Sequence, residues 1–498
     1  MLDIRSHLVE GWSENYSPQR GPLRPQLLVS VRKRQNRRLA GHRFRMVDTI
    51  FLLGVIIFFL QTTAEGSMLV TPLAEVIPVV VGVWSTWSMS SALGLYRFGR
   101  AERLFAHFAY LAMAALAGAS VALIFHWMVP AEQTEAADIL RLGALSGAGL
   151  AILHAVWWGL VARWRSRGLL TPNVVVVGAT RHAEDLISTT IDRGDMNILG
   201  VFDDRLERSP LAMLGVPVLG SADSMLRHRI MPYVDLIVVA IDQSAVTRVR
   251  QIMQRIAALP NPVTLLFDDV AGDCRAAAIE QIADAPLASL HPTTDAARKA
   301  FAKRVQDLVI GLVALVLFGP LMVLIALAVR LDSDGPVFFR QRRQGFNNEV
   351  ISVWKFRSME HEANNSQRIR QVTANDDRVT RIGRILRKTS LDELPQLFNV
   401  IVGEMSLVGP RPHMIGMKTG DVESAELVAE YAHRHRIKPG ITGWAAVNGS
   451  RGPLHEPEEV SRRVALDVGY IERQSVWLDL QIMVRTIPSM FGDGATTR

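Results

Sequence analysis

The chain has 498 residues, of which 49% are hydrophobic and 21% are charged, and its formal net charge is +7. This much apolar surface excludes an intrinsically disordered chain, and the length excludes a single small domain. A mean hydropathy of +0.17 predicts that part of the chain lies in lipid. The single cysteine, Cys274, excludes a disulfide framework and a cysteine-rich zinc module.

A basic segment, residues 1–45, precedes the first apolar run. Seven Arg and Lys side chains lie between Arg32 and Arg45. Such a juxtamembrane cluster gains about 1 kcal/mol per charge against an anionic leaflet. We therefore assign this segment to the cytoplasmic membrane surface. A nucleic-acid-binding arm is the alternative, but the apolar runs downstream favour lipid, so we expect no nucleic-acid partner.

Four apolar stretches follow, near residues 46–64, 76–95, 104–130 and 142–161, each about long enough to cross ~30 Å of hydrocarbon. Lys and Arg flank the bundle at both ends and in the second connection, whereas the first and third connections have none. The positive-inside rule then predicts a four-helix transmembrane domain, residues 46–165, with both ends in the cytoplasm.

Three histidines, His107, His126 and His154, lie in or near these predicted helices. Ionisable groups inside a membrane are candidates for function. Each of these histidines is single and has no partner nearby in the sequence, which favours a structural or interfacial role.

From about residue 171, short β-branched runs alternate with amphipathic helices, which predicts a parallel, doubly wound sheet. A dinucleotide site would need a second glycine where the backbone approaches the pyrophosphate. Gly178 and Ala183 fit the first and last positions of that fingerprint, but Thr180 stands at the second. Asp203 follows a strand, as a ribose-binding acid would. We predict a degenerate Rossmann-like domain, residues 171–292, with a structural or regulatory role; a working dinucleotide site is the alternative.

A fifth apolar segment, residues 308–329, has the length of a transmembrane helix but contains Gly319-Pro320. Proline removes a helical hydrogen bond and clashes with the preceding turn. Basic side chains flank both ends, so the charge asymmetry of a true span is missing. We predict a re-entrant membrane helix broken at Gly319-Pro320, with a kinked span as the alternative. The chain after it then lies at the cytoplasmic face, where soluble precursors meet membrane-embedded acceptors.

Charged motifs rich in Gly and Pro fill residues 335–450. They are G-P-V-F-F-R-Q from Gly335, K-F-R-S-M from Lys355, L-D-E-L-P-Q from Leu391, V-G-P-R-P from Val408 and K-P-G-I-T-G-W from Lys438. Guanidinium groups bind phosphate oxygens bidentately, and the adjacent acids Asp392 and Glu393 can hold Mg²⁺ or attack phosphorus. The same residues, Ser390 to Glu393, also fit a capping box. By themselves the motifs indicate anion binding and phosphoryl chemistry at a membrane.

This ordered set of motifs resembles the catalytic region of the monotopic phosphoglycosyl transferases, also called the bacterial sugar transferase family, and we assign it to residues 298–498. The four spans and the Rossmann-like module resemble the large members that start exopolysaccharide or capsule repeat units. The expected fold is therefore a membrane α/β protein with a transmembrane bundle, a parallel α/β module and a catalytic domain. The resemblance implies an enzyme of the bacterial inner (cytoplasmic) membrane whose catalytic domain is cytoplasmic.

The resemblance also implies the reaction. Asp392 would attack the β-phosphate of a UDP-sugar, release UMP and hold the sugar phosphate until undecaprenyl phosphate accepts it. Glu393, together with Asp392, would hold Mg²⁺ (or Mn²⁺). The remaining expected site residues comprise four phosphate contacts, Lys355, Arg357, Arg387 and Arg411, and two residues near the nucleotide, Arg436 and Lys438.

Some points of the resemblance leave alternatives open. The family commonly has glutamine where this chain has Ala446. Pro412-His413, Ser450-Arg451-Gly452 and residues 473–480 look most like members that use UDP-glucose, with UDP-galactose as the main alternative. A homodimer and downstream glycosyltransferases are further partners that the resemblance leaves open. Two other functions compete: an NAD-dependent nucleotide-sugar oxidoreductase or epimerase, and a non-enzymatic scaffold for capsule assembly.

Overall fold

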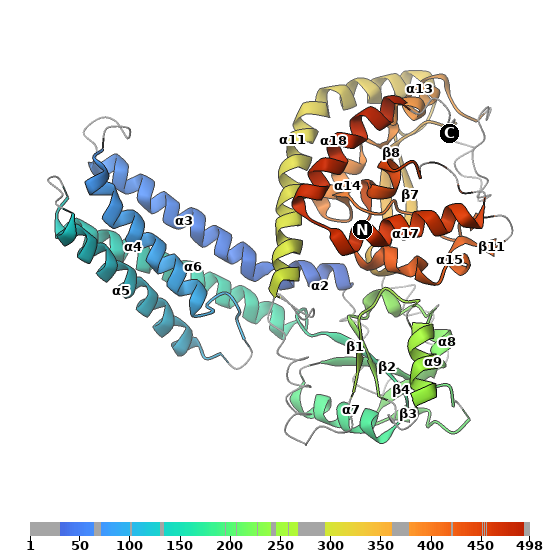
Figure 1. Ribbon diagram of the computed structural model, residues 1–498, viewed down its shortest axis with the longest axis horizontal. Helices are drawn as coiled ribbons and strands as arrows, with labels where there is room; N and C mark the ends of the chain where they lie inside the picture. Colours follow the sequence, from blue (N-terminus) through green and yellow to red (C-terminus); the bar gives the residue numbers. More distant parts are fainter. Residues whose placement is uncertain are drawn as a thin grey trace.

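The computed structural model describes residues 30–492 apart from 64–70, 100–101, 130–133, 241–245, 267–293, 361–377, 420–421 and the single positions 195, 206, 227, 257, 451, 453 and 455. Residues 1–29, Cys274 and the end of the predicted Rossmann-like domain lie outside the described residues. The described chain forms a helical bundle, an α/β domain and a C-terminal domain bordered by one long bent helix (Figure 1).

Four long helices pack together: α3 (Ala40–Thr63), α4 (Leu73–Ala92), α5 (Leu104–Met128) and α6 (Ala136–Ser166). They pack side by side, and each is long and apolar enough to cross a membrane (Figure 1). At the closest approach of α4 and α5, a Cβ on Gly118 would lie 1.8 Å from the Thr86 hydroxyl. Small residues thus bring two backbones together, as between helices in lipid. The protein is membrane-bound.

A six-stranded sheet forms the α/β domain in the described part of the chain, in the order β3-β4-β2-β1-β5-β6. Every neighbouring pair is parallel except β3 with β4. Its elements are β1 (Asn173–Val177), α7 (Arg181–Arg193), β2 (Asn197–Phe202), β3 (Ala212–Met213), β4 (Val216–Gly220), α8 (Ala222–Met225), η2 (Met231–Tyr233), β5 (Leu236–Val239), α9 (Val246–Ile256) and β6 (Val263–Leu265). The parallel strands, taken in chain order, lie in the Rossmann order 3-2-1-4-5. The predicted fold class is confirmed here.

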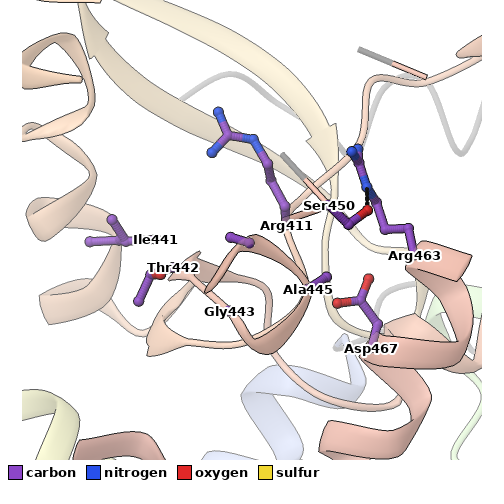
Figure 2. A pocket seen from close by; sticks show the side chains of 9 residues that line it. Arg411, Ile441, Thr442, Gly443, Ala445, Ser450, Arg463 and Asp467 are labelled. Atoms are coloured by element: carbon purple, nitrogen blue, oxygen red, sulfur yellow. Dashed lines mark hydrogen bonds between the residues drawn. The ribbon is translucent and has the colours of Figure 1, made fainter. Parts of the chain in front are cut away.

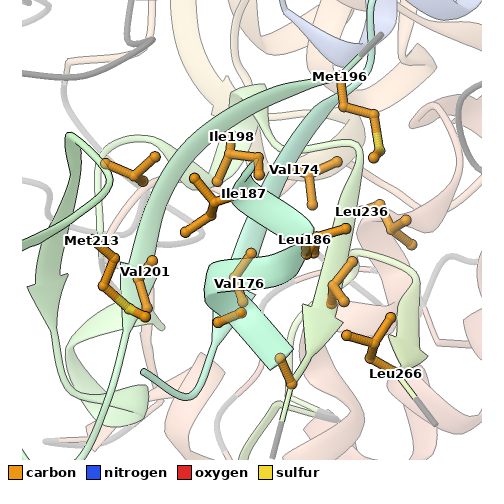
Figure 3. Close-up of a cluster of buried hydrophobic side chains, with 14 residues drawn as sticks. Val174, Val176, Leu186, Ile187, Met196, Ile198, Val201, Met213, Leu236 and Leu266 are labelled. Atoms are coloured by element: carbon orange, nitrogen blue, oxygen red, sulfur yellow. The ribbon is translucent and has the colours of Figure 1, made fainter. Parts of the chain in front are cut away.

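Helices cover both faces of this sheet. On one face Val174 and Val176 pack against Leu186 and Ile187 of α7, all at most 1% exposed (Figure 3). On the other face the intervening valines of β1 pack with Ile252 of α9. An unbroken run of valines fits a strand that is buried on both sides.

The turn after β1 is occupied by groups of the chain itself. Asp203 Oδ2 accepts a hydrogen bond from the backbone N–H of Ala179 at 2.6 Å. The Thr180 hydroxyl donates to the Ala240 carbonyl at 2.6 Å and accepts from the Ala183 N–H at 3.4 Å as the N-cap of α7. In a dinucleotide site the pyrophosphate lies at this helix N-terminus. An internal carboxylate here weighs against the oxidoreductase alternative.

Helix α11 runs without interruption from Thr294 to Asp332 and contains Pro320. The predicted break at Gly319-Pro320 is therefore wrong: the helix stays continuous, and Figure 1 shows its two halves pointing in different directions. A proline removes one hydrogen bond from the ladder and kinks the helix, while the bonds on either side continue it. By length and composition α11 is a fifth candidate span.

Both halves of α11 are tied to the C-terminal domain. Near its start, Arg304 donates to the carbonyls of Val400 and Ile401 at 2.7 Å each, which caps the end of α14 (Gln396–Val402). At its end, Arg357 donates to the Val329 carbonyl at 3.1 Å and to the Pro336 carbonyl at 2.9 Å. The apolar middle of the helix is thus held at two points while its exposed side chains remain available to lipid.

The C-terminal domain combines an antiparallel β7–β8 hairpin, a short parallel β9–β12 pair and helices around them. Its elements are β7 (Phe338–Gln344), η3 (Phe346–Asn348), β8 (Val350–Phe356), α13 (Arg381–Thr389), η4 (Leu391–Glu393), α14 (Gln396–Val402), β9 (Ser406–Val408), β10 (Lys418–Thr419), β11 (Val422–Glu423), α15 (Ser424–Leu427), η5 (Ala429–Arg436), β12 (Gly440–Thr442), α16 (Trp444–Val447), α17 (Pro457–Arg473) and α18 (Val476–Gly492). One core cluster joins β8, α14, β9, α17 and α18.

Helix α2 (Val31–Arg38) joins the three parts. Arg34 is 1% exposed; it donates to the Tyr233 carbonyl at 2.5 Å and faces Asp235 at 3.2 Å. Arg32 forms an ion pair with Glu349 of the C-terminal domain at 3.1 Å. The prediction that the whole basic cluster faces lipid is therefore wrong for these two arginines, because protein carboxylates hold them.

Replacing Arg34 by methionine should destabilise the α/β domain by about 3 kcal/mol, because it removes the cation that faces a buried carboxylate. Thermal unfolding of the purified full-length protein in detergent measures the change. Arg141→Met is the matched control: its ion pair with Asp138 is exposed and should contribute less than about 1 kcal/mol. Equal midpoints for the two variants would contradict a structural role for Arg34.

Candidate active site

The acid pair lies in a single turn of 3-10 helix after α13. Ser390 ends α13 in the left-handed conformation, at φ 57°, and η4 then carries Asp392 and Glu393, each 7% exposed. Ser390 makes no capping hydrogen bond with its side chain, so the capping-box interpretation of this motif is wrong. Two adjacent acids are thus buried at a bend of the chain, where charge is costly unless cations or donors compensate it.

Two cations compensate Glu393. Lys355 Nζ on β8 donates to Glu393 Oε1 at 2.9 Å. The Arg411 guanidinium spans the same carboxylate, with Nη1 3.3 Å from Oε2 and Nη2 in contact with Oε1. Glu393 and Asp392 in turn raise the pKa of Arg411, Glu393 most strongly. The structure therefore brings together four of the predicted site residues.

Close backbone packing positions Arg411. The Gly409 N–H donates to the Thr442 carbonyl at 2.9 Å, and the Gly440 N–H donates to the Pro410 carbonyl at 3.0 Å. A Cβ on Gly440 would lie 2.1 Å from the Gly409 nitrogen. The V-G-P-R-P and K-P-G-I-T-G motifs are therefore one structural unit, which needs glycine where the two segments touch.

A buried polar layer lies behind Arg411. Arg434 donates to the Arg411 carbonyl at 3.1 Å and pairs with Asp467 at 2.7 Å. His413 Nδ1 lies 2.6 Å from the Tyr431 hydroxyl. Burial and the neighbouring Arg434 hold the pKa of His413 well below its usual value, so this ring is neutral at pH 7. The layer fixes the backbone of Arg411, and its histidine adds no positive charge to the site at pH 7.

Two pockets share Arg411. The first, which we call the cationic pocket, is lined by Arg343, Lys355, Gln396 and Arg411 together with Val353, Pro412 and Gly440. Burial, and next the charge of Arg411, lower the pKa of Arg343 to about 10, so it remains a cation at pH 7. Three cations at one pocket favour a ligand with several negative charges.

The second pocket, which we call the Asp467 pocket, lies between β12, α16 and α17, and its empty space, open solvent included, is about 360 Å³. Its polar side chains are Arg411, Thr442, Ser450, Arg463 and Asp467, and Arg463 donates to the Ser450 hydroxyl at 3.0 Å (Figure 2). Mixed hydroxyl, carboxylate and guanidinium groups of this kind suit a neutral polyhydroxy ligand.

The other predicted site residues lie elsewhere. Arg357 is 2% exposed and its guanidinium donates to backbone carbonyls, so the structure corrects its role from phosphate contact to capping of α11. Arg387 is half-buried in the last turn of α13, five residues before Asp392, and stays a predicted phosphate contact.

The two residues predicted near the nucleotide do not face the acid pair. Burial, and next the charge of Arg304, lower the pKa of Lys438 to about 7, and its opposing acid is Asp307 of α11. Arg436 is exposed, with Glu472 as its acidic neighbour. Only the backbone of Lys438 approaches the site, at Gly409. Their contact with a nucleotide stays a prediction.

Arg343, Gln396, Arg463 and Asp467 line the pockets but are not among the predicted site residues. Arg463 and Asp467 are spaced i, i+4 on amphipathic α17, which puts them on one face of the helix and is the signal that could have found them. Arg343 belongs to the basic flank after the apolar segment, and that charge pattern does not single it out.

At this site, the carboxylates that could hold a magnesium ion are those of the acid pair, Asp392 and Glu393. In the described part of the chain no group of three His, Cys, Asp or Glu side chains has the arrangement of a metal site. Mg²⁺ commonly takes one or two carboxylates and completes its shell with water and substrate phosphates. Asp392 and Glu393 offer those carboxylates, although Glu393 already accepts from Lys355 and Arg411.

Gly440→Ala should reduce catalytic activity strongly and lower stability by about 1–3 kcal/mol, because the added methyl group forces β12 away from Gly409 and displaces Arg411. Sugar transfer and thermal unfolding measure the two effects. Gly319→Ala is the control, since a Cβ there meets no atom within 4 Å. Full activity of Gly440→Ala would contradict the close-packed unit.

Family models match two parts of the chain. Residues 298–493 match the model described as bacterial sugar transferase, and residues 91–266 match the model described as CoA-binding domain. The first contains the acid pair and both pockets, and the second contains part of the bundle and the described sheet.

Relatives with assigned names extend this similarity. A UDP-glucose:undecaprenyl-phosphate glucose-1-phosphate transferase of Xanthomonas campestris pv. campestris is 37% identical over 345 residues, 67% of this chain and 69% of that protein. The exopolysaccharide production protein PSS of Rhizobium leguminosarum bv. phaseoli is 46% identical over 187 residues, 38% of this chain and 94% of that protein.

A third relative bears on the sugar. It is a UDP-N-acetylgalactosamine-undecaprenyl-phosphate N-acetylgalactosaminephosphotransferase of Aeromonas hydrophila, 40% identical over 198 residues, 39% of this chain and 45% of that protein. The buried acid pair, its two cations and the similarity over two thirds of the chain lead to one conclusion: this protein is a membrane-bound enzyme that belongs to the bacterial sugar transferase family.

Proposed function

We propose that this enzyme transfers glucose-1-phosphate from UDP-glucose to undecaprenyl phosphate and so begins an exopolysaccharide or capsule repeat unit. The observation that carries the proposal is the buried Asp392–Glu393 pair facing Lys355 and Arg411. The names of the Xanthomonas and Rhizobium relatives support the substrates and the pathway. UDP-galactose remains the alternative donor, and a homodimer or downstream glycosyltransferases are the partners that this role would involve.

In the proposed first step, a carboxylate oxygen of Asp392 attacks the β-phosphorus of the UDP-sugar. The bond from that phosphorus to the bridging oxygen breaks, and UMP leaves with the electron pair. In the second step a phosphate oxygen of undecaprenyl phosphate attacks the same phosphorus, and Asp392 leaves as a carboxylate. Covalent catalysis thus divides a transfer between two anions into two displacements, and neither needs a proton.

The cations explain why Asp392 rather than Glu393 is the proposed nucleophile. Lys355 and Arg411 both bond to Glu393, which lowers the nucleophilicity of its oxygens. Arg343 and Arg411 line the same cationic pocket, so they are available to a diphosphate there. Charge on the transferring phosphoryl group is then stabilised by groups already in position. A bound Mg²⁺ (or Mn²⁺) at the acid pair would neutralise further phosphate charge.

The proposed location is the bacterial inner membrane, with the site on the cytoplasmic side. Basic side chains flank both ends of α11, and Arg304 and Arg357 tie its two halves to the same domain. A helix that enters and leaves through one leaflet satisfies both observations, and its bend at a proline provides the turn. This arrangement would hold the acid pair at the boundary where a lipid-linked phosphate and a soluble nucleotide sugar meet.

The Asp467 pocket is the proposed position of the hexose. Arg411 separates it from the cationic pocket, so a diphosphate bound in the latter directs its sugar toward Asp467 and Ser450. Carboxylate and hydroxyl groups accept hydrogen bonds from sugar hydroxyls, and glucose and galactose differ in the direction of one of them.

Asp392→Asn should reduce UMP release from UDP-glucose by on the order of 10⁴-fold, because an amide oxygen is a poor nucleophile toward phosphorus. UMP release is measured on the full-length protein with undecaprenyl phosphate and Mg²⁺. With donor alone, intact-protein mass spectrometry should detect a hexose-phosphate adduct on the wild type and none on the variant. Glu430→Gln, at an exposed acid of the same domain, is the control. Normal turnover by Asp392→Asn would exclude the mechanism.

Ala446→Leu should raise the KM for UDP-glucose by about tenfold or more and leave inhibition by UMP unchanged, because Ala446 lines the Asp467 pocket and leucine would fill it. The smaller change Ala446→Ser is the control. Assays with UDP-glucose, UDP-galactose and UDP-N-acetylgalactosamine identify the donor as well. An equal loss of affinity for UMP would mean that the pocket holds the nucleotide instead.

A further inference from the structure

A chain of four ionisable side chains runs through one end of the helical bundle. His154 Nε2 on α6 lies 2.9 Å from Asp48 Oδ2 on α3, and His154 Nδ1 lies 2.9 Å from His107 Nε2 on α5. His107 Nδ1 lies 2.7 Å from Glu102 Oε1 in the connection before α5. The two histidines that are single in the sequence are therefore neighbours in space.

These groups are shielded from solvent to different degrees. Asp48, His107 and His154 are each 0% exposed, whereas the Glu102 side chain is 20% exposed. Buried ionisable groups of this kind persist only where partners compensate the loss of water, and in membrane bundles they mark functional sites. The acid pair proposed to transfer the sugar phosphate lies in the C-terminal domain, so these groups have no part in that chemistry.

The three contacts fix the number of protons. An ionised carboxylate only accepts hydrogen bonds, and a neutral imidazole carries one ring proton. Each of the three contacts needs one proton between its two heavy atoms. Two neutral histidines between two ionised carboxylates supply only two. The observed chain therefore requires one proton more, whether it resides on a ring or on a carboxyl group.

The surroundings support a charged chain. The Trp157 indole donates to Asp48 Oδ1 at 3.2 Å, the Tyr96 hydroxyl bonds to the same carboxylate, and the Gly99 N–H donates to Glu102 Oε2 at 3.1 Å. Two arginines face the region from the packed helices. Arg45 of α3 stacks over Trp87 at 4.3 Å and Arg165 of α6 donates to the Phe98 carbonyl at 2.7 Å. Two carboxylates with one added proton carry a net charge of −1, which these cations offset.

We propose that Asp48, His154, His107 and Glu102 form a binding site for one proton, which enters and leaves through Glu102. The partly exposed end belongs to the α4–α5 connection, at the end of the bundle that faces the other two domains (Figure 1). The opposite end is the fully buried Asp48, whose other partners are Trp157 and the half-buried Tyr96. Tyr96 belongs to the same α4–α5 connection as Glu102, so the site stores a proton rather than conducting it across the membrane.

Proton occupancy sets how firmly three parts of the bundle are joined. The chain connects α3, α6 and the start of α5, and loss of the proton breaks at least one of its three hydrogen bonds. Helix α3 follows directly after α2, whose Arg32 and Arg34 hold the C-terminal and α/β domains. The packing of the end that carries both domains therefore depends on the proton concentration at that membrane face.

Nitrogen-15 NMR of the histidine rings, with full-length protein in lipid nanodiscs at pH 8, tests the proton count. Exposed histidines are neutral at that pH. If the extra proton is on a ring, we expect the signal of one doubly protonated histidine, which disappears in both His107→Gln and His154→Gln. If the proton is on a carboxyl group, we expect an infrared carboxylic-acid band, which disappears in Asp48→Asn or Glu102→Gln. His126→Gln, which lies on α5 like His107 but outside the hydrogen-bonded group of four side chains, should change neither signal. Two neutral rings beside two ionised carboxylates in the folded protein would overturn the proposal.

The pH dependence of unfolding gives a second measurement. Because the native state binds one proton more, stability should fall as pH rises through the value at which that proton leaves, and the unfolding equilibrium constant should rise by up to tenfold per pH unit. The double variant His107→Gln/His154→Gln should lose this contribution, and His126→Gln should keep it. The same pH profile for the double variant and the wild type would also overturn the proposal.

Discussion

The bonds from Lys355 and Arg411 to Glu393 are the interaction on which the proposed chemistry depends. Two adjacent acids, each only 7% exposed, would repel one another and lose their charge in a protein interior without cations. Because both cations bond to Glu393, the charge of that acid is compensated, and Asp392 is the acid that we propose to react. The charge that stabilises the acid pair in the absence of substrate is also the charge that a bound diphosphate would meet.

Each partner of this interaction is positioned by backbone rather than by flexible side chains. Lys355 is on a β-hairpin strand, the acids are on a turn that begins at a left-handed residue, and Arg411 follows a segment in contact with a glycine. Helix α11 adds a further constraint, because Arg304 and Arg357 fasten its two halves to the same domain. The bend of a membrane helix and the geometry of the acid pair are therefore parts of one rigid assembly.

In both the bundle and the α/β domain, buried carboxylates bond groups that a ligand or water would otherwise bond. Asp203 accepts the backbone N–H that a pyrophosphate would use, Asp235 holds Arg34, and Asp48 anchors a histidine chain away from water. Asp203 bonds within the α/β domain, Asp48 joins two helices of the bundle, and Asp235 bonds across to α2. Charge compensation over long separations in the sequence thus joins three parts that hydrophobic patterning alone would leave independent.

Local patterns along the chain were enough to predict the apolar helices, the parallel sheet and an acid pair among arginines, because hydrophobic period, strand–helix alternation and ordered motifs are local properties. It predicted Asp392, Glu393, Lys355 and Arg411 together, but it also grouped Arg357 with them. Long-range packing was needed to show that Arg357 caps α11, that α11 bends without a break, that the Ser390 side chain makes no capping hydrogen bond and that His107 meets His154. Those outcomes depend on which carbonyl, carboxylate or ring lies opposite a side chain, and such partners are tens to hundreds of residues away along the chain.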